Sequence, residues 1–242
     1  MPHILLYVAL AVVLLALGYW LLVITEGTYL GPRVVALLYD WTAHSYDRIK
    51  KLHFVDEASH IGIPLVDRLE TIAAAGLAST CVIDLACGTG RVALALRLAG
   101  GYEGLILGLD RSPGMLRVAH REASKANVAI TLLAGDVHRL PFTDHSAHAV
   151  TCLESIEFFG QPERVLAECY RVLRPGGILL TSNRVGVEAR WMPFRYAGRG
   201  RQEALLRQLG YQQVDTERWQ VHYDLIWAIK PVQDGDVGEI AS

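Results

Sequence analysis

The chain has 242 residues, of which 52% are hydrophobic and 20% are charged, and its formal net charge is -2 at pH 7. This length suits one domain of ordinary size with an additional segment, and a charge near zero does not indicate a nucleic-acid partner. Lysine and arginine are scattered along the chain, without a basic stripe that could follow a phosphate backbone. Composition therefore argues against nucleic acid as a substrate.

The chain opens with an uncharged apolar segment, residues 4–24. As a helix rising about 1.5 Å per residue, it would cover a hydrocarbon core about 30 Å thick. A cleavable signal peptide is the alternative, but the segment lacks a basic start and an A-x-A cleavage pattern, and it is too long. We predict that residues 1–25 form a transmembrane anchor.

The flanks of this segment predict its orientation. Tyr19 and Trp20 suit the interfacial belt of a membrane. Arg33 and Arg48 follow the segment, and no lysine or arginine precedes it. The positive-inside rule then predicts a single-pass membrane protein with the rest of the chain in the cytoplasm.

Residues 26–60 have helical spacing of apolar side chains, at Val34, Leu37, Leu38 and Trp41, with Pro32 at a favourable first helical position. We expect amphipathic helices beside the membrane. Two interpretations stay open: a packed helix that covers the domain, or an interfacial helix that lies on lipid.

From residue 61 onward, apolar strands alternate with helices. The strands are expected at 80–86, 104–110, 128–136, 147–155 and 176–183, and two further runs, 211–219 and 221–231, are close enough to pair as a hairpin. The pattern predicts an α/β, Rossmann-like, doubly wound and mostly parallel seven-stranded sheet with a C-terminal antiparallel hairpin, over residues 61–232. Residues 233–242 are polar, and we expect a disordered tail.

Acidic and glycine residues follow the first predicted strand, in "VIDLACGTGR". In an open parallel sheet, ligands bind beyond the carboxyl ends of the strands. Gly88 and Gly90 allow a tight turn that approaches a ligand closely, and the Asp84 carboxylate suits a cationic group better than a pyrophosphate. The turn therefore predicts a ligand that carries positive charge.

The next two strands also end in acids. Asp110 lies twenty residues beyond Gly90, where a carboxylate can accept hydrogen bonds from both hydroxyls of a ribose. Asp136 can accept from an exocyclic amine, and the Val137 amide can meet a ring nitrogen. Three strand-end acids therefore outline an adenosine with an amino-acid-like tail.

Four motifs, "VIDLACGTGR", "ILGLDRSPGML", "AGDVHRLPF" and "LRPGGILL", resemble the successive motifs of class I S-adenosylmethionine-dependent methyltransferases. The similarity covers residues 40–230 and is greatest to the type 11 group, which includes quinone-biosynthesis and phospholipid methyltransferases. It implies that S-adenosyl-L-methionine is the cofactor. The cofactor-binding residues implied are Tyr46, Asp84, Ala86, Gly88, Gly90, Asp110, Arg111, Met115, Asp136 and Val137.

The resemblance also assigns roles to these residues. The Asp84 strand end and the glycine turn would hold the methionine part, Asp110 the ribose, and Asp136 with Val137 the adenine. Met115 would line the adenine pocket, and Tyr46 would close over the methionine carboxylate. Ala86 departs from the glycine common in the family, a change between small residues.

For the acceptor side, we predict Glu154 near the cofactor and Glu157 facing the substrate as candidate catalytic residues. Both follow the fourth strand, but acids that begin a helix also stabilise its dipole. His148 is a poorer candidate because it begins that strand and should lie at its opposite end. His138, His145 and His148 lack metal-ligand spacing, so we expect solvated histidines and no metal.

The four cysteines, Cys81, Cys87, Cys152 and Cys169, lack a C-x-x-C spacing and favour buried reduced thiols. An anchor would hold the active site near lipid, so we expect a lipophilic methyl acceptor, such as a quinone precursor or a phospholipid headgroup. The arginine-rich stretch 183–201 would then meet anionic headgroups or form a surface lid.

Two alternatives to this enzyme remain. The chain could be a non-catalytic, membrane-tethered sensor or scaffold that binds S-adenosylmethionine, because a fold does not fix a function. A nicotinamide-dependent oxidoreductase is disfavoured, since "GTGRVA" lacks the third glycine of G-x-G-x-x-G.

Overall fold

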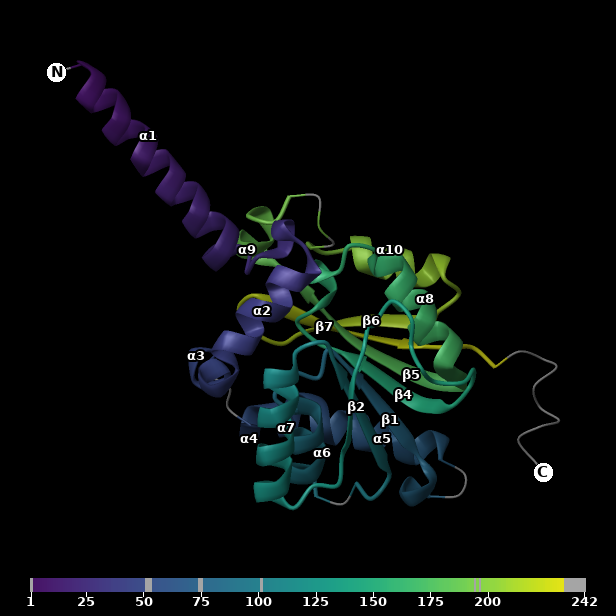
Figure 1. Ribbon diagram of the computed structural model, residues 1–242. Coiled ribbons are helices and arrows are strands. Elements are labelled where there is room, and N and C mark those ends of the chain that lie inside the picture. Colours follow the sequence, from purple (N-terminus) through teal and green to yellow (C-terminus); the bar gives the residue numbers. More distant parts are fainter. Residues whose placement is uncertain are drawn as a thin grey trace.

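The computed structural model describes residues 2–50, 54–73, 76–100, 102–193, 195 and 197–232. Its centre is a seven-stranded sheet with the order β3-β2-β1-β4-β5-β7-β6 (Figure 1). Its strands are β1 (Cys81–Leu85), β2 (Leu105–Asp110), β3 (Thr131–Ala134), β4 (Ala147–Cys152), β5 (Leu173–Arg184), β6 (Gln212–Arg218) and β7 (Tyr223–Ile229). Strands β1 to β5 pair in parallel, and β7 runs antiparallel to β5 and β6. The predicted α/β sheet with a C-terminal antiparallel pair is therefore confirmed.

Helices cover both faces of the sheet. On one face lie α5 (Ile63–Ile72), α6 (Arg91–Leu98) and α7 (Pro113–Ala126), and on the other lie α8 (Pro162–Val172) and α10 (Arg201–Gln208) (Figure 1). The shorter helical segments in this part are α4 (Phe54–Glu57), η4 (Ala58–Gly62), η5 (Leu77–Ser79), η6 (Ile156–Phe158) and α9 (Gly186–Arg190). Because both faces are covered, the central strand β4 is buried over its whole length, as its continuous apolar sequence predicts.

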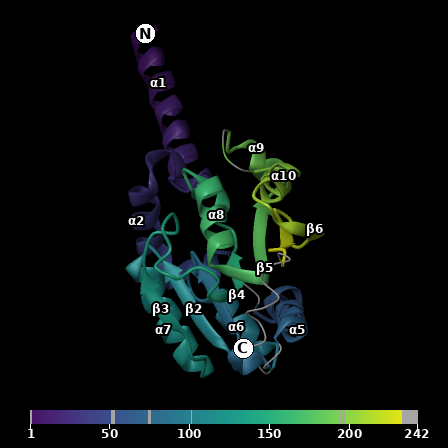
Figure 2. The same cartoon turned by 90° about the vertical axis from the view of Figure 1, so that its right-hand side faces the viewer.

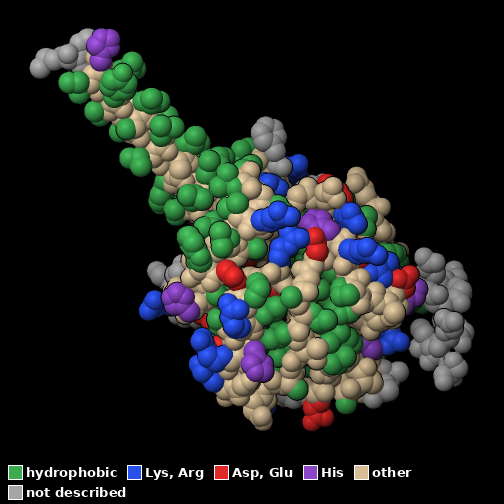
Figure 3. Space-filling model, in the orientation of Figure 1, with side chains coloured by type: hydrophobic (Ala, Val, Ile, Leu, Met, Phe, Trp, Pro, Cys, Tyr) green, Lys and Arg blue, Asp and Glu red, His purple; other side chains and the backbone are tan. Residues whose placement is uncertain are grey.

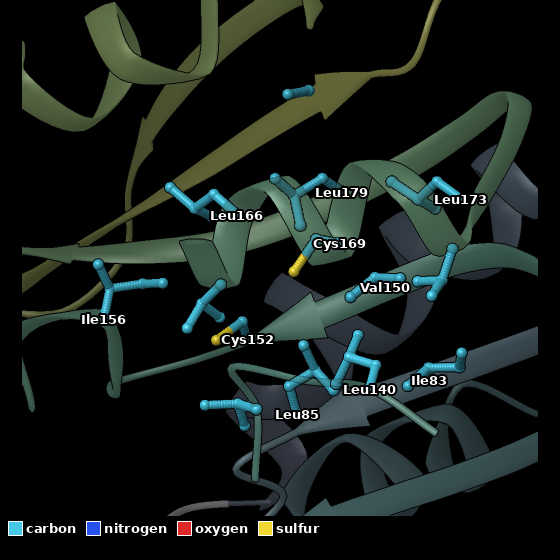
Figure 4. Close-up of a cluster of buried hydrophobic side chains, with 14 of the residues drawn as sticks. Ile83, Leu85, Leu140, Val150, Cys152, Ile156, Leu166, Cys169, Leu173 and Leu179 are labelled. Atoms are coloured by element: carbon cyan, nitrogen blue, oxygen red, sulfur yellow. The ribbon is translucent and has the colours of Figure 1, made fainter. Parts of the chain in front are cut away.

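The cysteines belong to the apolar layers between sheet and helices. Figure 4 shows Cys152 on β4 and Cys169 on α8 within one cluster of aliphatic side chains. Cys87 is also buried, Cys81 is half-buried, and all four are free thiols, as predicted. Burial raises the pKa of the Cys152 thiol to about 12, so this group stays protonated and acts as a small apolar side chain.

The run from Phe54 to Ile72 is continuously helical through α4, η4 and α5, and the predicted boundary between residues 60 and 61 falls inside η4. Gly62 on η4 is needed for this packing: a Cβ atom there would lie 2.3 Å from the Ala95 carbonyl oxygen on α6. Helix α4, which lies before the predicted boundary, packs against α6, as η4 and α5 do.

The N-terminal helix is apolar and exposed. Helix α1 (Pro2–Tyr19) continues into the π-helical turn η1 (Trp20–Ile24) and projects from the body of the molecule (Figure 1). The segment His3–Ile24 has a mean hydropathy of 2.5, and its most apolar part is not buried against the rest of the protein. Among the described residues, this is the one helix long and apolar enough to cross a membrane.

A short cover connects this helix to the sheet. It consists of η2 (Thr28–Leu30), α2 (Pro32–Thr42), η3 (Ala43–Ser45) and α3 (Tyr46–Lys50). Asp40 of α2 accepts hydrogen bonds from Ser112 Oγ and the Gly114 N–H, both at 2.6 Å, at the start of α7. Asp47 of α3 accepts from Thr89 Oγ1 at 2.6 Å in the glycine turn. Of the two interpretations of residues 26–60, the packing of α2 therefore supports a helix that covers the domain.

The stretch "LRPGG" joins α8 directly to β5. Helix α8 ends at Val172, but β5 begins at once at Leu173 and bulges before its regular pairing starts at Ile178. Gly176 supplies the left-handed residue of this bulge, with φ of 77°. The predicted tail, residues 233–242, lies outside the described residues.

Candidate cofactor and acceptor site

A cavity of about 510 Å³ lies at the carboxyl ends of the central strands. Two of its walls come from different parts of the chain. The sheet wall consists of residues that follow β1, β2 and β3, namely Ala86, Gly88, Asp110, Asp136 and Val137. The cover wall consists of residues from α2 and α3, namely Pro32, Val35, Ala36, Tyr39 and Tyr46. The site therefore combines a polar wall with a largely apolar one.

Asp110 is the most completely built polar group of the sheet wall. Its Oδ2 accepts from the Gly88 N–H at 2.9 Å, and its Oδ1 accepts from the Ser112 N–H at 2.8 Å. Burial raises the pKa of this carboxyl above its usual range, and these backbone hydrogen bonds partly offset the effect. Each oxygen retains a lone pair, so the carboxylate can still accept from two ligand hydroxyls.

The turn after β1 leaves room beside Asp110. Gly88 has φ of 53°, and a Cβ atom built on it would meet only the Ala86 carbonyl oxygen, at 4.0 Å, within 4 Å. Ala86 also has a positive φ, 51°, which explains why a glycine is common there in the resembling family. The open space over Gly88 fits a ligand that approaches the backbone, so the residues present fit the adenosyl cofactor.

Asp84 lies deeper than the sheet wall. It is 2% exposed, accepts from Thr151 Oγ1 at 2.6 Å, and lines a second cavity of about 30 Å³ that shares residues with the first. That volume suits one small polar group. Burial raises the pKa of Asp84 from 3.8 to about 7, so a cationic ligand group beside it would favour its ionised form.

Asp136 is more exposed than the other two acids. It forms an ion pair with Arg111 at 2.5 Å and accepts from the His138 backbone N–H at 3.0 Å. Burial opposes ionisation of Asp136, but the hydrogen bonds from His138 and the Arg111 charge outweigh it, so its pKa lies below the usual value. Arg111 thus reaches the cavity as the partner of Asp136.

The other predicted cofactor residues fall into two groups. Met115 and Tyr46 line the cavity and pack together in a small apolar cluster with Ala43 and Val118. Gly90 does not line either cavity. It has φ of 86° at the start of α6, and a Cβ atom there would lie 3.4 Å from Ala119 Cβ on α7. Gly90 therefore shapes the turn and the helix packing.

Glu154, the first of the two candidate catalytic acids, lines both cavities. Its Oε1 pairs with Arg91 at 2.7 Å, and its backbone N–H donates to Ser182 Oγ at 2.6 Å. Its φ of 47° is unusual for a residue other than glycine and directs the chain sharply after β4. The carboxylate is thus held at the junction of the two cavities.

Glu157 does not face the cavity, and that prediction is corrected. It is 0% exposed and does not line the site. Its Oε1 accepts from Arg184 Nε at 2.9 Å and from Tyr223 Oη at 2.5 Å. The one-turn helix η6 directs Glu157 toward β5 and β7, so this acid neutralises a buried guanidinium.

The prediction that His148 is solvated is wrong. Its side chain is buried, with 7% exposed, and its Nδ1 accepts a hydrogen bond from the Cys81 N–H at 3.1 Å. Burial and the Arg174 charge lower its pKa to about 4, so the ring is neutral. It lies at the amino end of β4, away from the cavity, as its position in the strand predicts. Among the described residues, no group of three or more metal-ligating side chains could hold a metal ion.

Several lining residues were not predicted. Tyr39 of the cover wall, with Phe158 and Phe159 after β4, adds aromatic surface, and His138 joins them through an edge contact with Phe159. The helical spacing of residues 34–41 indicates an apolar face, but it does not say what that face covers. Tertiary packing over the strand ends decides this.

The arginine-rich stretch 183–201 makes internal contacts. Arg184 is buried, Arg195 donates to the carbonyl oxygens of Thr28 at 2.8 Å and Phe159 at 3.2 Å, and Arg199 pairs with Asp224 at 2.6 Å. Three of its arginines therefore connect the stretch to the rest of the molecule.

Comparison with known proteins agrees with this geometry. Residues 83–181 match the family described as methyltransferase domain. The demethylmenaquinone methyltransferase of Thermus thermophilus is 41% identical over 100 residues, which cover 41% of this chain and 44% of that protein. The enzyme of that name from Lactiplantibacillus plantarum is 34% identical over 146 residues, 59% of each chain. The chain thus matches about half the length of these curated relatives.

The fold is shared more widely. A crystal structure of the cyclase SpnF has a TM-score of 0.63, covers 84% of this chain and 97% of its own, and is 18% identical. At this identity the likeness concerns the fold alone.

Residues 83–181, which run from β1 into β5, therefore carry the similarity to the methyltransferase domain family. The demethylmenaquinone methyltransferases are among the distant homologues of this chain.

Proposed function

We propose that the chain is a class I S-adenosylmethionine-dependent methyltransferase that is held at a membrane by α1, with its catalytic domain in the cytoplasm. It methylates a lipid-soluble aromatic acceptor of the quinone-precursor class. The observation that carries the proposal is the two-walled cavity. Its polar sheet wall suits the cofactor, and its apolar cover wall begins at Pro32, eight residues after the exposed apolar helix ends at Ile24. The names of the curated relatives support this acceptor class.

On the cofactor side, Asp110 would accept from the ribose hydroxyls and Asp84 would face the cationic end of the methionine part, with Asp136 and Val137 at the adenine. When bound, S-adenosylmethionine supplies an electrophilic methyl group. The residues of the chain hold the two reactants in place and exclude water from the cavity.

On the acceptor side, Tyr39, Phe158 and Phe159 provide aromatic surface for a planar ring. Glu154 is the acid placed to take a proton from a ring hydroxyl, because it lines the junction of the two cavities. Arg91 holds its carboxylate in position. Glu157 has no part in this step.

A direct test uses the full chain in lipid vesicles that contain a demethylated quinol, with methyl-labelled S-adenosylmethionine. We expect label in the extracted quinone fraction, and none with Asp110→Ala. Label in the phospholipid fraction would identify a headgroup acceptor. Binding of the cofactor without any labelled product would indicate the sensor or scaffold.

The role of Glu154 is tested separately. Glu154→Gln keeps a hydrogen-bonding group beside Arg91, so we expect cofactor affinity to change little while kcat falls by about 10²-fold. A kcat equal to that of the wild type would remove Glu154 from the mechanism.

A further inference from the structure

The end of the apolar helix is fixed to the segment that follows α9. Trp20 Nε1 donates to the Trp191 carbonyl oxygen at 3.2 Å, and Tyr29 Oη donates to the Pro193 carbonyl oxygen at 2.6 Å. The rings of Trp20 and Tyr29 stack with their centroids 5.1 Å apart. Two segments about 170 residues apart in sequence therefore meet at the base of α1.

Arg195 reinforces this junction from the other side. Its guanidinium donates to the Thr28 carbonyl oxygen at 2.8 Å and lies over the Tyr29 ring, 5.1 Å from the centroid. Thr25 and Thr28, between η1 and α2, are 0% and 2% exposed. The connection between α1 and the domain is thus packed and hydrogen-bonded, so α1 has a defined direction relative to the domain.

The segment at this junction presents apolar side chains outward. Val187 and Trp191 are 64% and 55% exposed. They lie near the end of α1, whose apolar side chains are exposed as well. Arg190, between them, is exposed as well. Figures 1 and 2 both place α9 next to the end of α1, and Figure 3 shows Lys and Arg side chains on the body of the protein beside that end.

We propose that Val187, Arg190 and Trp191, the α9 patch, form a second membrane contact that rests on the bilayer interface beside the point where α1 enters. The proposal rests on the membrane attachment under the proposed function. Tryptophan prefers the interfacial region of a bilayer, and arginine is attracted to anionic headgroups. A valine and a tryptophan left exposed beside a bilayer-spanning segment find their apolar surroundings there.

This contact has a consequence for the acceptor. Arg195 also donates to the carbonyl oxygen of Phe159, which lines the cavity. The α9 patch, the base of α1 and the cavity are therefore connected through one loop. A bilayer that touches the patch lies beside the cover wall, where a lipid-dissolved ring would enter.

Fluorescence quenching tests the contact in the full chain. The protein is placed in vesicles of phosphatidylcholine and phosphatidylglycerol whose acyl chains carry bromine, which quenches tryptophan at short range. We expect Trp191→Phe to reduce the quenchable fluorescence. Trp227→Phe is the matched control, because Trp227 is 3% exposed within the sheet core and lies away from lipid, so this variant should leave the quenchable fluorescence unchanged.

Enzyme assays test the consequence. We expect the double variant Val187→Ser, Trp191→Ser to lower the rate with a long-chain quinol in vesicles several-fold and to leave the rate with a water-soluble short-chain analogue unchanged. Leu98→Ser removes another exposed apolar side chain, on α6, and should affect neither rate.

The outcomes separate the two proposals. Loss of quenching from α1 through Trp20→Phe, but not through Trp191→Phe, would overturn the α9 patch and leave the anchor. Equal quenching loss in both variants with no methylated quinol would support the patch and overturn the acceptor. Unquenched protein that forms dimers through α1 would overturn the membrane contact.

Discussion

The sheet wall and the cover wall of the cavity are built in different ways. The sheet wall comes from three consecutive strand ends, and its polar groups are oriented by backbone hydrogen bonds within a few residues of sequence or between adjacent strands. The cover wall comes from residues 32–46 and is held by side chains that reach far along the chain, such as Asp40 to Ser112. The matched family region, residues 83–181, includes the first wall and omits the second. The matched region therefore contains the acidic residues proposed for the cofactor and the aromatic residues Phe158 and Phe159, whereas the cover wall lies outside it.

The largest effect is expected at Arg184 of β5, a buried residue outside the cavity lining. Its guanidinium, 4% exposed, pairs with Glu157 at 2.9 Å and with Glu26, between η1 and η2, at 3.4 Å. Arg184→Met leaves a buried carboxylate without its partner, so we expect the free energy of unfolding to fall by about 3–5 kcal/mol in urea titration.

The double variant Glu157→Gln, Arg184→Met is the control for Arg184. Because it removes both charges, we expect it to be less destabilised than the sum of the single variants, by about 0.5–3 kcal/mol. Additive losses would show that Glu157 and Arg184 do not stabilise each other.

On the sheet wall, Asp110→Ala should weaken S-adenosylhomocysteine binding about 100-fold, measured by calorimetry. Hydrogen bonds to a charged group contribute about 1.5–3 kcal/mol each, and the Gly88 and Ser112 amides would also lose their acceptor. Asp136→Ala is the comparison: it is more exposed and should weaken binding less. The reverse order would contradict the assignment of Asp110 to the ribose.

Asp84 gives an effect that depends on pH. Its folded-state pKa, about 7, lies above its ordinary value of 3.8, so the stability it contributes is fully present below the ordinary pKa and is lost as pH rises toward 7. Relative to Asp84→Asn, the wild type should therefore lose stability by up to about 1.4 kcal/mol per pH unit in this window. Thermal unfolding of both proteins from about pH 4.5 to about pH 8 measures it.

Bound cofactor should change this pH dependence of stability. A cationic group beside Asp84 favours the ionised carboxylate, so saturating S-adenosylmethionine should flatten the difference between wild type and Asp84→Asn. An unchanged pH dependence would place the positive charge elsewhere.

The smallest effect concerns the cover wall alone. Asp40→Ala removes the acceptor for Ser112 Oγ and the Gly114 N–H, and we expect a loss of about 1 kcal/mol in stability. Amide hydrogen exchange in residues 32–46 should become faster, while exchange in β1 and β4 stays slow. Asp67→Ala, on the outer side of α5, is a control acid; equal exchange in both variants would mean that Asp40 does not hold the cover.

The sheet and the polar side of the site could be predicted because their signals are local. Continuous apolar runs indicate buried parallel strands, and acids directly after them must lie at one edge of the sheet. Boundaries were less accurate: β3 covers only Thr131–Ala134 within the predicted 128–136, because its register with β2 runs only from Thr131 to Ala134.

The direction of Glu157 and the burial of His148 could not be predicted, because both depend on tertiary contacts. Glu157 meets an arginine 27 residues away, and His148 meets a backbone amide 67 residues away. Helical periodicity identified the apolar face of residues 32–42, but helix α7, against which α2 packs, lies far along the chain at Pro113–Ala126.

The insertion of β7 between β5 and β6 also determines where the chain leaves the fold. Because β7 runs against its parallel neighbour, Ile229 pairs with Ile178 near the start of β5, at the opposite edge of the sheet from the cavity. Figure 1 shows the chain leaving the sheet on the side away from α1. An affinity tag or fluorescent reporter fused after Val232 would therefore emerge far from the substrate entrance, whereas one fused to the amino terminus would have to share the environment of α1.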